Sequence, residues 1–154
     1  MSEEAAPAAA FFVAGGMGRM TELETGMTQS YLGLAAAFGL SAVAMGAFGA
    51  HGLQGLVGAD GLTPWRTAVD YQMFHALALL ALAAQPAMAD SRAGRFAGRA
   101  FTVGILLFSG SLYLLVLSRQ PWLGAVTPAG GLCLMAGWGA LGLHAWRNRR
   151  GARP

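Results

Sequence analysis

Eight polar side chains interrupt otherwise apolar runs of this sequence, and they are the residues best suited to chemistry. None of them is Asp, Glu, Lys or Arg. Imidazoles can ligate haem iron or a metal ion, while amides and hydroxyls hydrogen-bond small molecules or one another. Two histidines alone do not complete a metal site, and no carboxylate lies in the same runs. The eight candidates are His51, Gln54, Gln72, His75, Ser109, Ser111, Tyr113 and Thr127.

The surrounding composition is that of an integral membrane protein. Of 154 residues, 55% are hydrophobic and only 11% are charged, whereas soluble domains average about 25% charged residues. The net charge of +3 comes from arginine, because the chain contains no lysine. We interpret this positive charge as a determinant of orientation in the membrane rather than as a sign of nucleic-acid binding. The single cysteine, Cys133, excludes an intrachain disulfide and CxxC redox chemistry.

Four uncharged runs each have the length of one membrane-spanning helix. They are Thr25–Ala59, Tyr71–Ala89, Ala100–Ser118 and Gln120–Trp146. A spanning helix needs about 20 apolar residues, and these runs lack the alternation of barrel strands. The sequence therefore predicts an all-α, multi-pass bundle of four transmembrane helices in the inner membrane. The predicted spans are Ser30–Val57, Tyr71–Ala87, Ala100–Leu117 and Trp122–Trp146.

The placement of arginine predicts the orientation of this bundle. With four spans, both termini and the connection between the second and third spans lie on one side. That side carries eight of the ten arginines, and the other side carries only Arg66 and Arg119. Because positive charge is retained in the cytoplasm, both termini are predicted to be cytoplasmic, with residues 148–154 as a basic tail.

The polar side chains of the four spans are predicted to meet in one layer. At about 1.5 Å of rise per residue, one polar residue of each span lies roughly 8–10 Å inside the outer end of its helix. Gln54 and Gln72 each lie three residues from a histidine and share its helix face. The four residues at this depth are His51, His75, Tyr113 and Thr127.

Three interpretations of this polar layer remain open. The favoured one is a hydrogen-bonded network that fixes helix register, because Pro128 would also leave the Gly124 carbonyl needing a partner such as Thr127. The second is a small-molecule or ion site, and the third is haem ligated by His51 and His75. The spans contain no charged residue, which disfavours proton-coupled pumps and drug antiporters. No catalytic residue, cofactor or metal is assigned.

Small residues recur at helical spacing in the first and fourth spans. Such stripes let neighbouring helix backbones approach closely, either within the bundle or between subunits. The first stripe is Gly46, Gly49, Gly52 and Gly55, and the second is Ala125, Ala129, Cys133 and Gly137.

Residues 1–26 differ from the rest of the chain. They contain four glutamates and one arginine, and their apolar piece, Ala5–Gly18, is too short to span a membrane. Their acidic start is also wrong for a secretory signal peptide. We predict that residues 27–147 form the membrane domain, that Met27 is the biological start, and that residues 1–26 are a disordered tail or an upstream extension.

Four sequence blocks resemble the small membrane-protein family called domain of unknown function 423. The resemblance runs from about Met27 to about Arg147, with the blocks in order. It implies a compact protein of four membrane helices with no established activity and no catalytic residue to carry over. The blocks are GAFGAHGL (Gly46–Leu53), YQMFHALALL (Tyr71–Leu80), FSGSLYLLVL (Phe108–Leu117) and LGAVTPAGGLCLMAGW (Leu123–Trp138).

Two functions remain compatible with these features. The first is a non-enzymatic protein of the lipid bilayer that acts as an accessory or assembly partner of a larger membrane complex, or as a homo-oligomer. The second is a binding or transport protein whose outer polar layer holds a lipid, a quinone, haem, an ion or another small molecule. Neither function involves nucleic acid.

Overall fold

The structure, a computed structural model, describes the backbone of residues 6–151 and the side chains of residues 26–58 and 60–150. This part of the chain is almost wholly helical and contains no strand. The all-α prediction is therefore confirmed for the described residues. The elements are α1 (Ala6–His51), α2 (Ala59–Ala83), α3 (Pro86–Ala89), α4 (Arg92–Ser118), the 3₁₀ turn η1 (Pro121–Ala125) and α5 (Thr127–Gly151).

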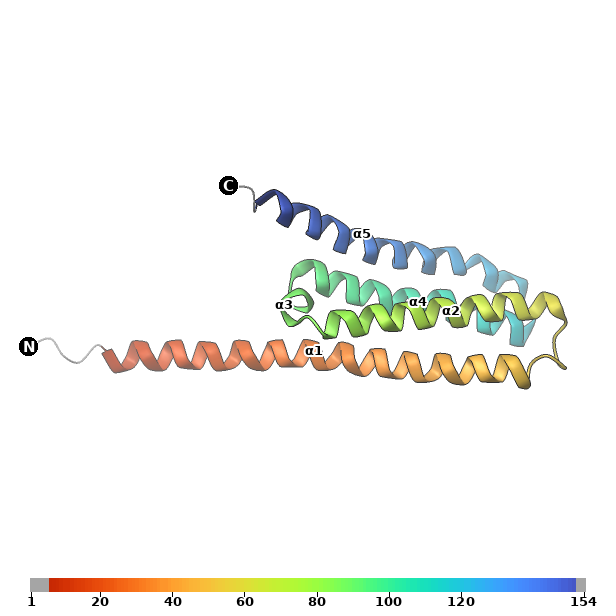
Figure 1. Cartoon of the computed structure of the whole chain (residues 1–154), viewed down its shortest axis with the longest axis horizontal. Helices are drawn as coiled ribbons and strands as arrows, with labels where there is room; N and C mark the ends of the chain where they lie inside the picture. The colour runs from red at the N-terminus through yellow and green to blue at the C-terminus, as the bar shows by residue number, and fades with distance from the viewer. Residues whose placement is uncertain (1–5, 152–154) are drawn as a thin grey trace, which may run out of the picture.

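The four long helices lie side by side in alternating directions (Figure 1). α2 packs against both α1 and α4, and α5 packs mainly against α4. The beginning of α1 and the end of α5 lie at the same end of the bundle as α3 (Figure 1). We call this the α3 end and the opposite end the η1 end.

Two clusters of buried apolar side chains hold the helices together. The larger cluster lies toward the α3 end and includes Tyr31, Leu79, Phe101 and Leu134. The smaller cluster, at the η1 end, is formed by Leu53, Trp65 and Val116. Each cluster draws side chains from at least three segments of the chain, so burial of apolar surface links the whole bundle.

The first helix differs from its prediction at both ends. It ends at His51 rather than Val57, because the amides of Gly52 and Leu53 both bond to the Phe48 carbonyl and close the helix. Glycine is costly to hold in a helix, and the chain turns here so that Leu53 enters the core at 1% exposure. That residues 1–26 are a disordered tail or an extension upstream of a biological start at Met27 stays a prediction. At this other end, the backbone of residues 6–25 continues α1. The Ala, Met, Leu and Glu residues of that segment are good helix formers.

The second helix begins 12 residues before its predicted start at Tyr71 and ends four residues before its predicted end. Asp60, Arg66 and Asp70 led us to assign this early part to a connection, but all three are exposed on the helix surface. Trp65, in the same turn as Arg66, is buried at 1% exposure. The helix stops before Pro86, because a residue that precedes proline disfavours helical geometry.

The third and fourth predicted spans also have different starts. α4 begins at Arg92, where the Ser91 side chain caps the helix by accepting a 2.9 Å hydrogen bond from the Gly94 amide. α5 begins only at Thr127. Pro128 therefore lies in the first turn of a helix, where its missing N–H costs nothing, and not inside a helix as predicted. The preceding residues form η1 instead.

The two predicted stripes of small residues are only partly inside the bundle. Gly49 packs on Trp65 and Gly137 on Phe101, and a Cβ at either glycine would lie 2.6 Å from a ring atom. Gly46 faces Val69 at an ordinary 3.5 Å, and Cys133 is half-buried. The other four members lie outside the helix–helix contacts. Gly52 and Gly55 follow the end of α1, and Ala125 and Ala129 are exposed.

Three helical segments are long and apolar enough to cross a membrane. They are Gly26–His51, Arg92–Ser118 and Pro121–Arg150. The remaining long helix, α2, is less apolar because it carries charged residues at its start and Gln72 and His75 near its middle.

Gly130 tests how closely α4 and α5 must approach. A Cβ at Gly130 would meet backbone atoms of Leu107 and Phe108, whereas a Cβ at Gly139 on the same helix would meet nothing within 4 Å. We expect Gly130→Ala to lower the free energy of unfolding by about 1–3 kcal/mol through overpacking. The control Gly139→Ala is expected to be neutral or stabilising, since alanine is the better helix former. Unfolding titrations in mixed detergent micelles measure both, and equal stability of the two variants would contradict the contact.

Candidate functional site

Gln72 is the centre of a hydrogen-bonded network that joins three helices. Its side chain is 4% exposed. The amide Nε2 donates to the Phe38 carbonyl at 2.9 Å and to Ser41 Oγ at 2.7 Å, both on α1. The amide Oε1 accepts from the Tyr113 hydroxyl of α4 at 3.0 Å. Ser41 can accept from Gln72 because its own proton goes to the Ala37 carbonyl at 2.8 Å.

His75, one turn further along α2, connects that helix to α5. It is 6% exposed, and its Nε2 accepts from Trp138 Nε1 at 3.1 Å. Its Nδ1 lies 2.7 Å from the Tyr71 carbonyl, which can only accept. The imidazole is therefore neutral with its proton on Nδ1, and Phe101 packs against both rings of this pair. With both nitrogens occupied, His75 has no lone pair free for haem iron.

A third pair joins the two last helices. Ser111 Oγ and Thr127 Oγ1 lie 2.8 Å apart, and the Ser111 hydroxyl is also 3.0 Å from the Phe108 carbonyl. Thr127 thus bonds to Ser111, and not to the Gly124 carbonyl as we had considered. Ser109, on the same helix, is 1% exposed and has no hydrogen-bond partner among the described residues.

His51 and Gln54 do not belong to this interior. Both are exposed, and His51 is the last residue of α1. Their predicted depth assumed that the helix continued to Val57, and this part of the shared-layer prediction is wrong because the chain leaves the helix after His51. The structure brings together Gln72, Tyr113 and Ser41 at one point and His75 with Trp138 at another.

Sequence reasoning missed Ser41, Trp65 and Trp138 as hydrogen-bonding residues. Trp65 Nε1 donates to the Met45 carbonyl of α1 at 2.8 Å, and Trp138 supplies the bond to His75. A tryptophan well inside an apolar run was the available indication for Trp138, since its N–H needs an acceptor away from water. For Ser41 no indication was available, because serine commonly bonds its own helix backbone.

The described residues contain no group of three or more His, Cys, Asp or Glu side chains that could hold a metal ion. The arrangement is one of neutral donors and acceptors that satisfy one another between helices. Chemically, this arrangement fixes the rotation and register of α2 against α1 and α4 and ties it to α5 through one bond.

The comparisons with known proteins place the chain in a family. Residues 45–131 match the family model described as "Protein of unknown function (DUF423)". A UPF0382 membrane protein of Haemophilus influenzae is 39% identical over 123 residues, which cover 80% of this chain and 98% of that protein. This chain belongs to the DUF423 family. The resemblance inferred from the four sequence blocks is confirmed.

Other members of the DUF423 family are named as membrane proteins as well. The UPF0382 inner membrane protein YgdD of Escherichia coli K12 is 39% identical over 125 residues, covering 80% of this chain and 95% of YgdD. The UPF0382 membrane protein YwdK of Bacillus subtilis is 43% identical over 103 residues, covering 64% and 81%. No solved structure gives a significant match. Together with the apolar helices, these relatives identify the chain as a multi-pass protein of the inner membrane.

The bond between His75 and Trp138 can be measured with a double-mutant cycle. Interhelical hydrogen bonds in membranes contribute about 0.6 kcal/mol on average. We therefore expect His75→Leu and Trp138→Phe each to lower stability, and the double variant to lose about 0.6 kcal/mol less than their sum. The matched control is His51→Leu with Trp138→Phe, which should be additive because His51 is exposed on another helix. Additivity for His75 would mean that the bond contributes nothing.

Proposed function

We propose that this protein is a non-enzymatic accessory subunit of a larger membrane complex, which it contacts through the exposed face of α1. In this proposal all four long helices cross the membrane and both termini are cytoplasmic. The chain would then act by packing against a transmembrane helix of its partner, and the buried polar network would keep the contact face rigid.

The exposed face of α1 carries the proposal. Its residues follow one another at alternating spacings of four and three, which is the spacing of a helix–helix seam. Most of them are small, and Gly33 has nothing within 4 Å of where its Cβ would lie. Small residues allow the close backbone approach by which helices associate in lipid. We call this face the α1 seam; it consists of Gly33, Ala37, Leu40, Ala44, Ala47 and His51, all exposed.

The interior of the bundle supports a structural role rather than catalysis. Both ends of the Gln72 amide and both nitrogens of His75 have protein partners. A general acid or base must reach a proton of its substrate, and these groups are already committed to other helices. His51, by contrast, lies at the η1 end of the α1 seam, where it is available to a partner.

The four-span arrangement is supported by packing and by charge. α2 lies between α1 and α4 and runs antiparallel to both (Figure 1). Because both neighbours are long and apolar enough to cross a membrane, this packing favours a span for α2 as well. Its polar side chains Gln72 and His75 are buried at 4% and 6% exposure and do not face lipid. Eight of the ten arginines flank the ends on the side of the termini, which favours a cytoplasmic location of that side.

Co-purification from native membranes in mild detergent tests the proposal. We expect the wild type to elute with a second membrane protein, and Ala37→Leu with Ala44→Leu to reduce that yield by about tenfold or more, a loss of about 1.4 kcal/mol. The control, Ala81→Leu with Ala136→Leu, adds the same volume at exposed positions of α2 and α5 and should retain the partner. A wild type that elutes alone, as a monomer or as a homo-oligomer, would contradict the accessory role.

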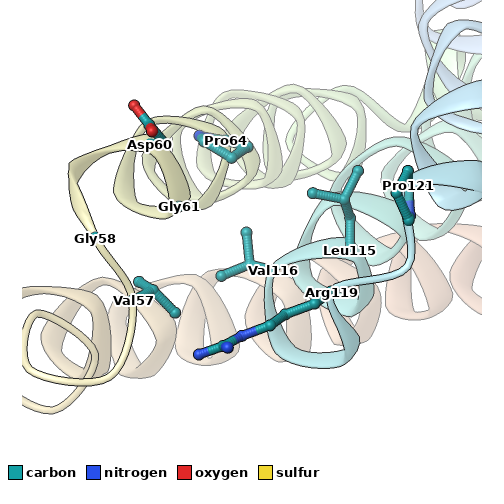
Figure 2. A pocket seen from close by; sticks show the side chains of 9 residues that line it. All are labelled: Val57, Gly58, Asp60, Gly61, Pro64, Leu115, Val116, Arg119 and Pro121. Carbon is teal, nitrogen blue, oxygen red and sulfur yellow. The ribbon is translucent and has the colours of Figure 1, made fainter.

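A cavity at the η1 end supports a second candidate function, the binding of a small amphiphilic molecule. Its volume is about 590 Å³, within the range of ligand pockets. Figure 2 shows Arg119 reaching below Val116 toward Val57, while Asp60 points away from the other side chains. Arg119 Nη2 donates to the Leu56 carbonyl at 3.2 Å, which fixes a positive charge beside a wall that is apolar apart from Asp60. The lining includes Val57, Gly58, Gly61, Pro64, Leu115 and Pro121.

Filling this cavity tests the second candidate. Gly58→Leu places a side chain in the cavity, because Gly58 lines it and has open space around its Cβ position. Native mass spectrometry should show a bound small molecule on the wild type and its loss from Gly58→Leu. Gly55→Leu, in the same loop but outside the lining, should retain the bound mass. Identical spectra for the wild type and Gly58→Leu would exclude a ligand at this place.

A further inference from the structure

A second cavity lies at the opposite end of the bundle, between the start of α4 and the end of α5. Its volume is about 450 Å³. α5 is packed closely on α4 where Gly130 and Gly137 contact Phe108 and Phe101, and it leans away from α4 toward its own C-terminal end (Figure 1). The cavity occupies the opening between them. We call it the basic groove; it is lined by Arg92, Ala93 and Phe96 of α4 and by Ala140, Leu143, His144 and Arg147 of α5.

The charged side chains that line the basic groove are all positive. Two arginines, one from each helix, line the same space, and the lining contains no Asp or Glu. Asn148 Nδ2, an amide donor, lies 3.0 Å from His144 Nε2, so the His144 tautomer that accepts this bond carries its proton on Nδ1, a further donor. Guanidinium groups form charge-assisted, often bidentate hydrogen bonds with phosphate oxygens. The groove therefore suits a phosphate held between two helices.

The floor of the basic groove is apolar, and its position is that of a lipid headgroup. Phe96 and Leu143 are 54% and 45% exposed, and each lies about one helical turn nearer the middle of its helix than the arginine of that helix that lines the groove. Trp146 lies one residue before Arg147, with the Arg150 guanidinium 3.8 Å from the centre of its ring. Tryptophan and arginine side by side mark the boundary between hydrocarbon and headgroups. A ligand here would have a phosphate at the boundary and a hydrocarbon tail below it.

We propose that the basic groove is a binding site for one anionic phospholipid. The phosphate is held between Arg92 and Arg147 with a hydrogen bond from His144, and an acyl chain lies on Phe96 and Leu143. This differs from general attraction of a basic tail to anionic lipid, because residues of two helices and an apolar floor form a defined space. The site lies at the other end of the molecule from the η1-end cavity and does not include the α1 seam, so it stands independently of both proposed functions.

Lipid retention tests this site. The full-length protein is reconstituted with phosphatidylglycerol in an excess of phosphatidylcholine and examined by native mass spectrometry after detergent extraction. We expect one phosphatidylglycerol to remain on the wild type. Arg92→Gln with Arg147→Gln should reduce that retention by about tenfold or more. The matched control is Arg149→Gln with Arg150→Gln, which removes the same charge from outside the lining and should change retention by less than about twofold, since salt screens exposed charges.

A third variant separates loss of the site from loss of the fold. Leu143→Trp leaves the charge unchanged and fills the groove at an exposed position; it should also lose the lipid while eluting as the wild type does in detergent. Equal losses from both arginine pairs would overturn the proposal in favour of diffuse electrostatics. Retention by Leu143→Trp, or full displacement of the lipid by inorganic phosphate, would likewise overturn it, because a free anion needs no acyl-chain floor.

Discussion

An amide and an imidazole removed from water must find every hydrogen bond inside the protein, and the rest of this bundle is arranged around that requirement. Both groups belong to α2, as Gln72 and His75. Leaving such a group unpaired in hydrocarbon costs several kcal/mol, whereas each interhelical bond made contributes only about 0.6 kcal/mol. The network thus stabilises the native state modestly and penalises alternatives strongly. A shift of α2 by one turn, about 5.4 Å, would separate Gln72 from its partners on both α1 and α4.

Close packing and hydrogen bonding depend on the same positions. Gly49 leaves room for the Trp65 ring, which brings Trp65 Nε1 to 2.8 Å from the Met45 carbonyl. Gly137 leaves room for Phe101, whose ring packs against both His75 and Trp138 at centroid separations of 5.4 and 5.2 Å. A larger residue at either glycine would push a ring outward and lengthen the bond beside it. Small residues are therefore needed where a polar contact must be made across two helices.

Hydropathy and charge were sufficient to predict the helical class and the approximate place of each long helix, because burial of apolar runs determines both. They could not place the ends. α1 stops at His51 since the Phe48 carbonyl accepts two turn amides, a local choice that hydropathy does not report. Counting depth along each helix placed Tyr113 level with His75 and Thr127, but Tyr113 bonds to Gln72 instead, one turn before His75, and Thr127 bonds to Ser111. The same counting failed for His51, since it continued a helix through glycines that in fact form a turn. Trp138 was missed because a tryptophan in an apolar run gives no indication of which helix carries its acceptor.

Because the buried side chains of Gln72 and His75 already have protein partners, the chemically open features lie at the periphery. α5 contacts the bundle mainly through α4, and its last close glycine contact is Gly137 against Phe101. Beyond that point Gly139 and Gly142 meet nothing within 4 Å and Leu141 is only partly buried against the larger cluster, so less packing opposes the separation of the two helix ends. Arg92 and Arg147 then face one groove from opposite sides, and their like charges, together with the positive start of α4, favour that separation. An anion between them removes the repulsion and adds hydrogen bonds to both helices. Binding there would therefore hold α5 more firmly against α4, since the internal network holds α5 by only one bond to His75 and one bond to Ser111.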